Sequence, residues 1–143
     1  MDASIVLPKT ADRKALYEAL FPQVEALLND GSDAIAAMAN MAAVLHTAFA
    51  WHWTGFYRVV GQELVLGPFQ GPVACSRIPY GKGVCGTAWK ENKTMIVADV
   101  DAFPGHIACS TLSRSEMVVP VRNVQGEVMA VLDIDSAHLN DFD

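Results

Sequence analysis

The sequence contains no apolar segment close to the roughly 20 residues that a helix needs to cross a bilayer. Its first residues, MDASIVLPKTADRK, also lack the apolar stretch and small-residue cleavage site of a secretory signal. Basic residues are few, 10 against 16 acidic ones, and the net charge is -6. Proteins that bind nucleic-acid backbones usually carry clustered Lys and Arg, so this charge argues against such a partner. We therefore predict a cytoplasmic protein with neither a nucleic-acid nor a membrane partner.

Cysteine is scarce as well: the chain has three, spaced C-x9-C-x23-C. This spacing has no C-x2-C pair of the kind that places thiolates around zinc, although His106, three residues before Cys109, would complete a Cys3His set. An odd number of cysteines in a reducing compartment argues against a disulfide framework. The thiols are therefore inert core residues, redox groups or, as the interpretation least favoured by the spacing, metal ligands.

Apolar residues, in contrast, make up 52% of the 143 residues, which is enough for the core of one domain. They recur at helical spacing over 9–29, with Thr10 as the expected N-cap. A second helix is expected to follow the cap Ser32 and to run through Phe49. No repeat or internal linker divides the chain.

After the helices, the apolar pattern takes the period of β-strands. WTGFYRVV and ELVLGPFQG, joined by Gly61-Gln62, predict one hairpin, and EMVVPVRNVQGEVMAVLDID predicts another that turns at 123–126. Between them, the Gly- and Pro-containing stretch 71–92 predicts a loop that ends in a short helix over 84–91, and TMIVADV predicts a further strand. Two helices followed by five or six strands indicate an α+β domain, with helices packed on a mainly antiparallel sheet.

All three cysteines fall in predicted loops or at the ends of predicted elements. A free cysteine is usually buried and inert, but these positions favour an accessible thiol. Cys85 falls in the first turn of the short helix, where backbone N–H groups favour a thiolate. Cys109 has His106 and Arg114 close in sequence, and either favours the thiolate if the loop folds back. The residues alone do not choose between the two as nucleophile.

Acidic residues form a second group of candidates, at the ends of predicted strands: Asp99, Asp101, Glu116, Asp133 and Asp135. Because residues two apart on a strand share a face, Asp133 and Asp135 point the same way. Such acids either cap turns and strand ends in solvent, or bind a substrate ammonium and donate a proton to a leaving oxygen.

Aromatic residues mark the start of the first predicted strand. Trp51, Trp53 and Tyr57 share one face if the strand begins near Trp51. Most stripes of this kind belong to a core. This one can also form the wall of a pocket for a thioether or sulfoxide, because aromatic surfaces contact polarizable sulfur favourably.

The stretch from Trp53 to Asp135 resembles the free methionine-(R)-sulfoxide reductases, a family with the GAF fold. The similarity runs, in the same order, through WTGFYRV, LVLGPFQGPVAC, RIPYGKGVCGTAW, VADVDAFPGHIACS, SRSE and VLDIDS. GAF sensor domains share the architecture but lack this cysteine-bearing series. The resemblance implies a single GAF domain over 1–143, in which the C-terminal helix of the family is missing or shortened.

The matching positions imply a role for each cysteine. Cys109 in GHIACS would be the catalytic cysteine and Cys75 in GPVAC its resolving partner. Cys85 in GVCG would be an auxiliary thiol, in place of the nucleophile that its helix position favours. The other matches are implied catalytic acids and residues of the substrate pocket: Trp53, Tyr57, Glu116, Asp133 and Asp135.

The implied reaction reduces free L-methionine-(R)-sulfoxide. The Cys109 thiolate attacks the sulfoxide sulfur while Glu116 or Asp133 protonates the oxygen, and methionine leaves. The resulting sulfenic acid condenses with Cys75, and an external dithiol, thioredoxin by resemblance, reduces the disulfide. The scheme needs no metal or organic cofactor, and the family also implies a homodimer. The alternatives are a non-catalytic GAF sensor of a small ligand and a Cys/His metal-binding regulator.

Overall fold

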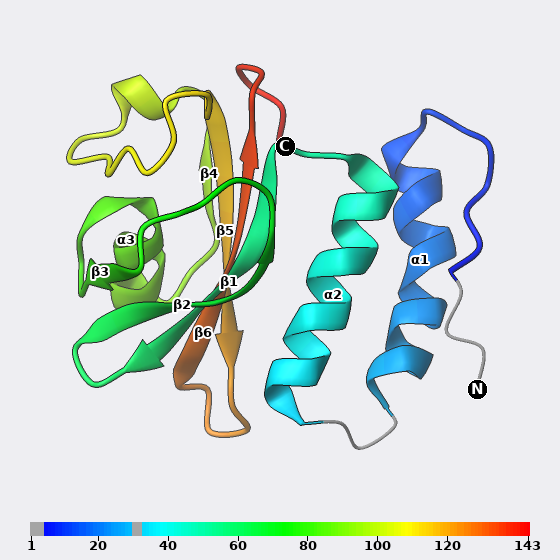
Figure 1. The fold of residues 1–143 in the computed structure, drawn as a ribbon, viewed down its shortest axis with the longest axis horizontal. Coiled ribbons are helices and arrows are strands. Elements are labelled where there is room, and N and C mark those ends of the chain that lie inside the picture. The colour runs from blue at the N-terminus through cyan, green and yellow to red at the C-terminus, as the bar shows by residue number, and fades with distance from the viewer. Residues whose placement is uncertain (1–4, 30–32) are drawn as a thin grey trace.

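The computed structural model describes residues 5–29 and 33–143, and it has two helices followed by a six-stranded sheet with a third helix inserted among the strands (Figure 1). This arrangement confirms the predicted α+β fold class. The elements in chain order are α1 (Arg13–Leu28), α2 (Ala34–Phe49), β1 (Trp53–Val60), β2 (Glu63–Gln70), β3 (Arg77–Pro79), α3 (Gly83–Glu91), β4 (Met95–Val97), a 3-10 turn (Val100–Ala102), β5 (Ser115–Arg122) and β6 (Val128–Ser136).

Each pair of neighbouring strands in the sheet is antiparallel, and the strand order is β3-β2-β1-β6-β5-β4. The two predicted hairpins, β1–β2 and β5–β6, are confirmed. They join through β1 and β6 at the centre of the sheet, where Trp53 pairs with Asp135 and Gly55 with Asp133. The end of the last strand therefore lies beside the beginning of the first.

The sheet separates two apolar clusters. Helices α1 and α2 lie on one side of it, while α3 and the long loops lie on the other (Figure 1). Side chains of β6 alternate between them: Ile134 packs with Leu45 of α2 and with Trp51, whereas Val131 packs on the other face with Val84 of α3. The face toward α3 is the one that carries the polar residues described below.

The ends of the two long helices differ from the sequence prediction. Asp12, not Thr10, caps α1, because the Asp12 side chain accepts the backbone N–H two residues further on. Thr10 instead accepts the N–H of Asp12, so α1 begins later than expected. Asp33 caps α2 in the same way. Ser32, the expected cap, lies outside the described residues.

Two short strands also differ from the sequence prediction: one was not predicted, and the other is shorter than predicted. β3 falls within the stretch predicted as loop, where Ile78 pairs with Leu64 of β2. The predicted strand TMIVADV ends early, at Val97, because Asp99 then caps the 3-10 turn by accepting the N–H of Asp101. Strands of three residues carry too little alternation to be recognised in a sequence.

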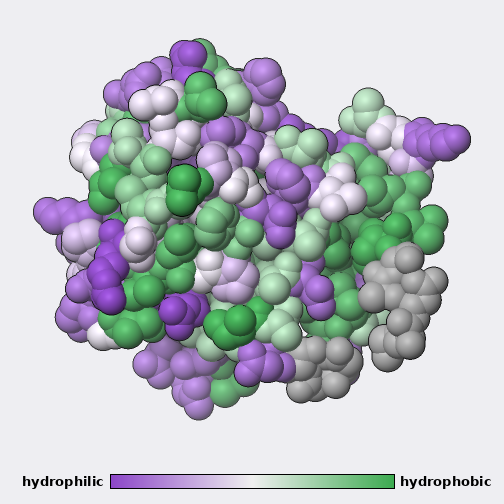
Figure 2. All heavy atoms as spheres, in the orientation of Figure 1, coloured by the Kyte–Doolittle hydropathy of each residue, from purple (hydrophilic) through white to green (hydrophobic). Residues whose placement is uncertain are grey.

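Apolar atoms gather on the surface at the α1 end of the molecule (Figure 2). Tyr17 and Phe21, both on α1, are large apolar residues with exposed side chains. No helix in the part of the chain that the structure describes is both long enough and apolar enough to span a bilayer.

Candidate active site

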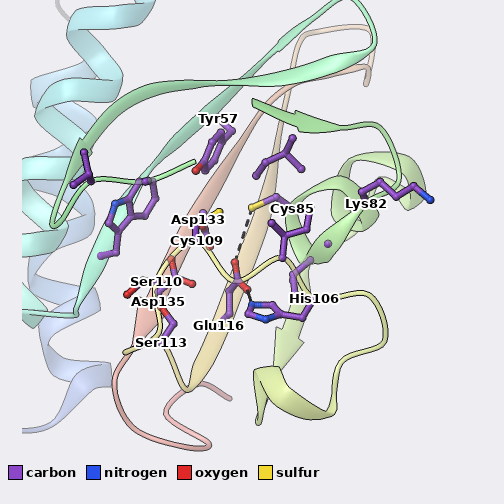
Figure 3. Close-up of a pocket in the computed structure, with 17 residues that line it drawn as sticks. Tyr57, Lys82, Cys85, His106, Cys109, Ser110, Ser113, Glu116, Asp133 and Asp135 are labelled. Carbon is purple, nitrogen blue, oxygen red and sulfur yellow. Dashed lines mark hydrogen bonds and ion pairs between the residues drawn. The ribbon is translucent and has the colours of Figure 1, made fainter. Parts of the chain in front are cut away.

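One pocket lies on the α3 face of the sheet, and several strands, a helix and two loops contribute to it (Figure 3). Seven of the eight site residues expected from the sequence line it, namely Trp53, Tyr57, Cys85, Cys109, Glu116, Asp133 and Asp135. The eighth, Cys75, is bonded to one of them. Side chains that are up to 82 residues apart in the chain therefore meet in one site, because β1 and β6 are neighbours.

Cys75 and Cys109 form a disulfide, with their Cα atoms 5.4 Å apart. Cys75 lies in the loop after β2, and Cys109 in the loop that precedes β5. Both residues are half-buried, and Cys109, but not Cys75, lines the pocket. The third cysteine, Cys85, is buried and free. The two loops therefore bring together the pair of thiols that the resemblance singled out.

Three buried carboxyl groups gather in the pocket: Glu116 is 5% exposed, Asp133 6% and Asp135 8%. Glu116 pairs directly with Asp135 across β5 and β6, and the strand period turns Asp133 to the same face as Asp135. Burial raises the pKa of Asp133 well above its usual range, and the nearby charges of Asp135 and Glu116 raise it further. Burial, followed by the charge of Glu116, likewise raises the pKa of Asp135. The alternative of solvated strand-end acids is wrong for these three residues.

One polar atom of this cluster has no partner. Asp133 Oδ1 is buried and makes no hydrogen bond to the protein. A buried carboxyl oxygen left without a donor is costly, and it is therefore a natural place for a hydrogen-bond donor of a ligand.

Cys85 lies against the same acids. Its Sγ is 3.9 Å from Glu116 Oε2, and burial raises the pKa of the Cys85 thiol, with further increases from the charges of Asp133 and Glu116. The argument that the start of α3 makes Cys85 a thiolate is therefore wrong. Desolvation and neighbouring negative charge favour the neutral thiol, and they outweigh the helix end.

The aromatic side chains divide between the two faces of the sheet. Trp53 and Tyr57 line the pocket, as expected, and their ring centroids are 5.9 Å apart. Trp51 does not join them, because β1 begins at Trp53 and Trp51 packs on the other side of the sheet against Phe142. Burial, followed by the charges of the pocket acids, raises the pKa of Tyr57, so its hydroxyl is a hydrogen-bond donor.

Several other residues that the sequence offered as candidates do not take the positions expected of them. His106 lines the pocket, and its Nε2 lies 3.8 Å from the carboxyl oxygen Oε1 of Glu116. Arg114 is exposed, and Asp99 and Asp101 lie outside the pocket. The Cys3His metal set does not form, because two of its three thiols are bonded to each other.

The sequence also left some pocket residues unnamed. Ser110 lines the pocket directly after Cys109, and its Oγ is 3.1 Å from Nε2 of His52, which precedes β1. Lys82 contributes to the rim, with its amino group directed away from the acids (Figure 3). The only signal that pointed to Ser110 was its position next to a candidate nucleophile. Nothing in the sequence indicated that His52 contacts this loop.

Comparisons with known proteins agree with this architecture. The family described as "GAF domain" matches residues 24–143. A "GAF domain-containing protein A" of Dictyostelium discoideum is 56% identical over 128 residues, which are 89% of this chain and 80% of the relative. A "Free methionine-R-sulfoxide reductase" of Escherichia coli is 42% identical over 132 residues, 92% of this chain and 79% of the relative.

A solved structure is closely similar as well. The X-ray structure of free methionine-R-sulfoxide reductase from Neisseria meningitidis, in complex with its substrate, superimposes with a TM-score of 0.92 at 53% identity, covering 98% of this chain and 85% of that one. Fold and site together define a GAF domain whose pocket is lined by three buried acids and by one cysteine of a disulfide-bonded pair. The chain belongs to the free methionine-R-sulfoxide reductase family of GAF domains.

Proposed function

We propose that this protein reduces free methionine-(R)-sulfoxide to methionine in the cytoplasm, with Cys109 as nucleophile, Cys75 as resolving thiol and thioredoxin as reductant. Relatives from Escherichia coli and Saccharomyces cerevisiae that carry the name of this reductase are 42% and 38% identical to the chain. The observation that supports the proposal most is the Cys75–Cys109 disulfide at a pocket that holds three buried acids.

The geometry favours Cys109 over Cys75 as the nucleophile. Cys109 lines the pocket with the acids, whereas Cys75 lies outside that lining and reaches the site through the disulfide. In the proposed first step the Cys109 thiolate attacks the sulfoxide sulfur and one proton is taken up by the sulfoxide oxygen. The S–O bond of the substrate breaks, an S–O bond forms on Cys109, and methionine leaves. Cys109 is oxidised to a sulfenic acid, and the substrate is reduced by two electrons.

The acids suit both substrate binding and proton donation. Burial and the neighbouring charges raise the pKa of Asp133, which favours a protonated carboxyl in this cluster. Asp133, or Glu116 in its place, is the proposed donor of a proton to the sulfoxide oxygen. The remaining negative charge, with the unpartnered Asp133 Oδ1, suits the α-ammonium of a free amino acid. Asp135 adds to this negative field. A methionine sulfoxide within a peptide has an uncharged amide nitrogen there, so the site favours the free substrate.

The proposed second step forms the disulfide between Cys75 and Cys109. The Cys75 thiol attacks the sulfenic sulfur of Cys109, the S–O bond breaks, and the hydroxyl group leaves with the thiol proton as water. Thioredoxin, an external dithiol, then reduces the disulfide by exchange and returns both cysteines to thiols. Cys85, with its raised pKa, serves as an auxiliary thiol rather than as the first nucleophile.

An assay that couples thioredoxin to NADPH oxidation tests the proposal with two variants. Cys109→Ser should abolish the reduction of free methionine-(R)-sulfoxide. Cys75→Ser should release about one methionine per enzyme and then stall with thioredoxin, because the sulfenic acid has lost its partner. Sustained turnover by Cys109→Ser would overturn the assignment. Binding of the sulfoxide without any turnover by the wild type would instead indicate a GAF sensor.

Substitutions of the acids test the pocket. Glu116→Gln and Asp133→Asn should each reduce kcat/KM sharply, since each removes a proton donor or a charge that holds the ammonium. Free and peptide-bound methionine sulfoxide should be compared in the same assay. Unchanged kinetics in both variants, or equal rates with both substrates, would exclude these roles.

A further inference from the structure

Two aromatic side chains of β1 hold the loop that carries Cys75. Tyr57 Oη donates a hydrogen bond of 2.9 Å to the carbonyl oxygen of Cys75 itself. Trp53 Nε1 donates one of 3.1 Å to the carbonyl oxygen of Pro72, in the same loop. Trp53 and Tyr57 are four residues apart on one strand and are only 4% and 2% exposed. Both donors therefore come from rigid, buried rings.

The packing around Trp53 leaves its indole little freedom. The ring stacks on Phe69, with centroids 5.2 Å apart. A Cβ atom added at Gly71 would lie 2.7 Å from Trp53 Cδ1, and one added at Gly55 would lie 2.8 Å from Trp53 Cη2. The backbone of the Cys75 loop thus lies directly against the indole, and only glycine permits that approach.

The loop has few other restraints. Within the part of the chain that the structure describes, residues 71–76 make one further backbone hydrogen bond, in which the Ser76 carbonyl accepts the N–H of Leu66. Residues 71–75 belong to no helix or strand. Ala74 also packs against the apolar core. When the disulfide is open, the hydrogen bond from Tyr57 is therefore the polar contact that holds the Cys75 carbonyl.

We propose that Tyr57, assisted by Trp53, is a positioning residue for the resolving cysteine and sets the rate of disulfide closure in addition to lining the pocket. The inference rests on the proposed function. The step concerned is the attack of the Cys75 thiol on the Cys109 sulfenic acid, which forms the S–S bond, breaks the S–O bond and releases water. Holding the Cys75 backbone raises the effective concentration of its thiol near Cys109.

Tyr57→Phe tests the inference, because it removes the donor and keeps the ring in the pocket wall. In a single turnover with methionine-(R)-sulfoxide, the variant should form the disulfide roughly 5-fold more slowly relative to methionine release, the usual effect of one lost hydrogen bond. The sulfenic acid should then accumulate and be trapped by a 1,3-dione. Tyr80→Phe removes the same group outside the pocket and should leave the ratio of the two rates unchanged.

A second measurement needs no substrate. Equilibration of the Cys75–Cys109 pair with glutathione reports the effective concentration of the two thiols. In Tyr57→Phe the fraction of disulfide at a fixed glutathione ratio should correspond to an equilibrium constant lowered by a similar factor, because the freed loop loses more entropy on closure. Tyr80→Phe again serves as the control.

The outcomes separate this inference from the proposed function. Unchanged closure and an unchanged glutathione equilibrium in Tyr57→Phe would overturn the positioning role. A slower release of methionine with normal closure would also overturn it, and would place the hydroxyl on the substrate. Failure of the wild type to release any methionine would refute the proposed function, whereas a lowered glutathione equilibrium in Tyr57→Phe would still support positioning of the cysteine.

Discussion

The buried acids predict a variant that gains stability while it loses activity. Asp133 is 6% exposed, has an oxygen without a partner, and lies beside Glu116 and Asp135. Asp133→Asn keeps the shape of the side chain but removes its ionisable group. The new amide can also donate a hydrogen bond to a neighbouring carboxylate. We therefore expect the variant to be more stable than the wild type at neutral pH.

The sign of the effect follows from proton binding. The pKa of Asp133 is raised in the folded state, above the value of 3.8 that suits an unperturbed side chain. Between these two values the folded protein binds more protons than the unfolded chain, so the free energy of unfolding falls as the pH rises through that window. Above this pH window, the free energy of unfolding of the wild type is lowered by the whole cost of keeping an ionised carboxyl buried. Below pH 3.8 the carboxyl is protonated in both states, and the penalty disappears.

The expected gain is about 1 to 2 kcal/mol, typical of relieving strain in a functional site. For a chain of this length it corresponds to a rise in Tm of roughly 3 to 8 °C. Thermal unfolding of the disulfide form should be followed at several pH values from about 3 upward. The gain should be largest at pH 7 to 8 and vanish near pH 3.

The control is Asp101→Asn, which changes an exposed acid outside the pocket. It should leave Tm within about 1 °C of the wild type at each pH, since exposed substitutions have small effects. A lower Tm for Asp133→Asn at pH 7, or a gain that persists at pH 3, would refute the account of charge repulsion and burial.

Three further predictions follow from burial and backbone geometry. Native Cys85 should resist alkylation by iodoacetamide at pH 8, because burial raises the pKa of its thiol, and mass spectrometry should find it modified only after unfolding; rapid modification of the folded protein would contradict this. Gly71→Ala should lower the free energy of unfolding by about 1 to 3 kcal/mol more than Gly126→Ala. Both glycines have positive φ, but only at Gly71 does the new Cβ meet another side chain, so equal losses in urea titrations would refute the reasoning. Leu64→Ala, at a fully buried position, should cost about 2 to 5 kcal/mol. Val124→Ala, at a position 97% exposed, should cost less than about 0.5 kcal/mol, and similar costs for both would argue against the assigned core.

The sequence predicted the long strands and hairpins well, because their information is local. The alternation in β1, β2, β5 and β6 and the turn residues between them depend on neighbours within a few positions. Helix starts were less accurate. Thr10 and Asp12 are both good caps, and the choice of Asp12 depended on which backbone N–H the chain presented to it.

In the candidate site, too, features set by local sequence were predictable and features set by tertiary packing were not. The shared face of Asp133 and Asp135 follows from the strand period and was predictable. Their burial beside Glu116 was not, since it depends on the pairing of β5 with β6 and on the cover of α3. Trp51 and Trp53 were expected to share a face, but the strand began later than the pattern suggested, and they lie on opposite sides of the sheet.

The sequence by itself determined which thiols and acids this chain has, and a resemblance carried by its motifs indicated the part of each. Local chemistry alone left both Cys85 and Cys109 as candidate nucleophiles, because a helix end is visible in sequence and burial among acids is not. Only the tertiary structure decided that Cys85 is a neutral, buried thiol while Cys109 meets Cys75. Desolvation and charge act through space, and the residues that set them come from strands far apart in the chain.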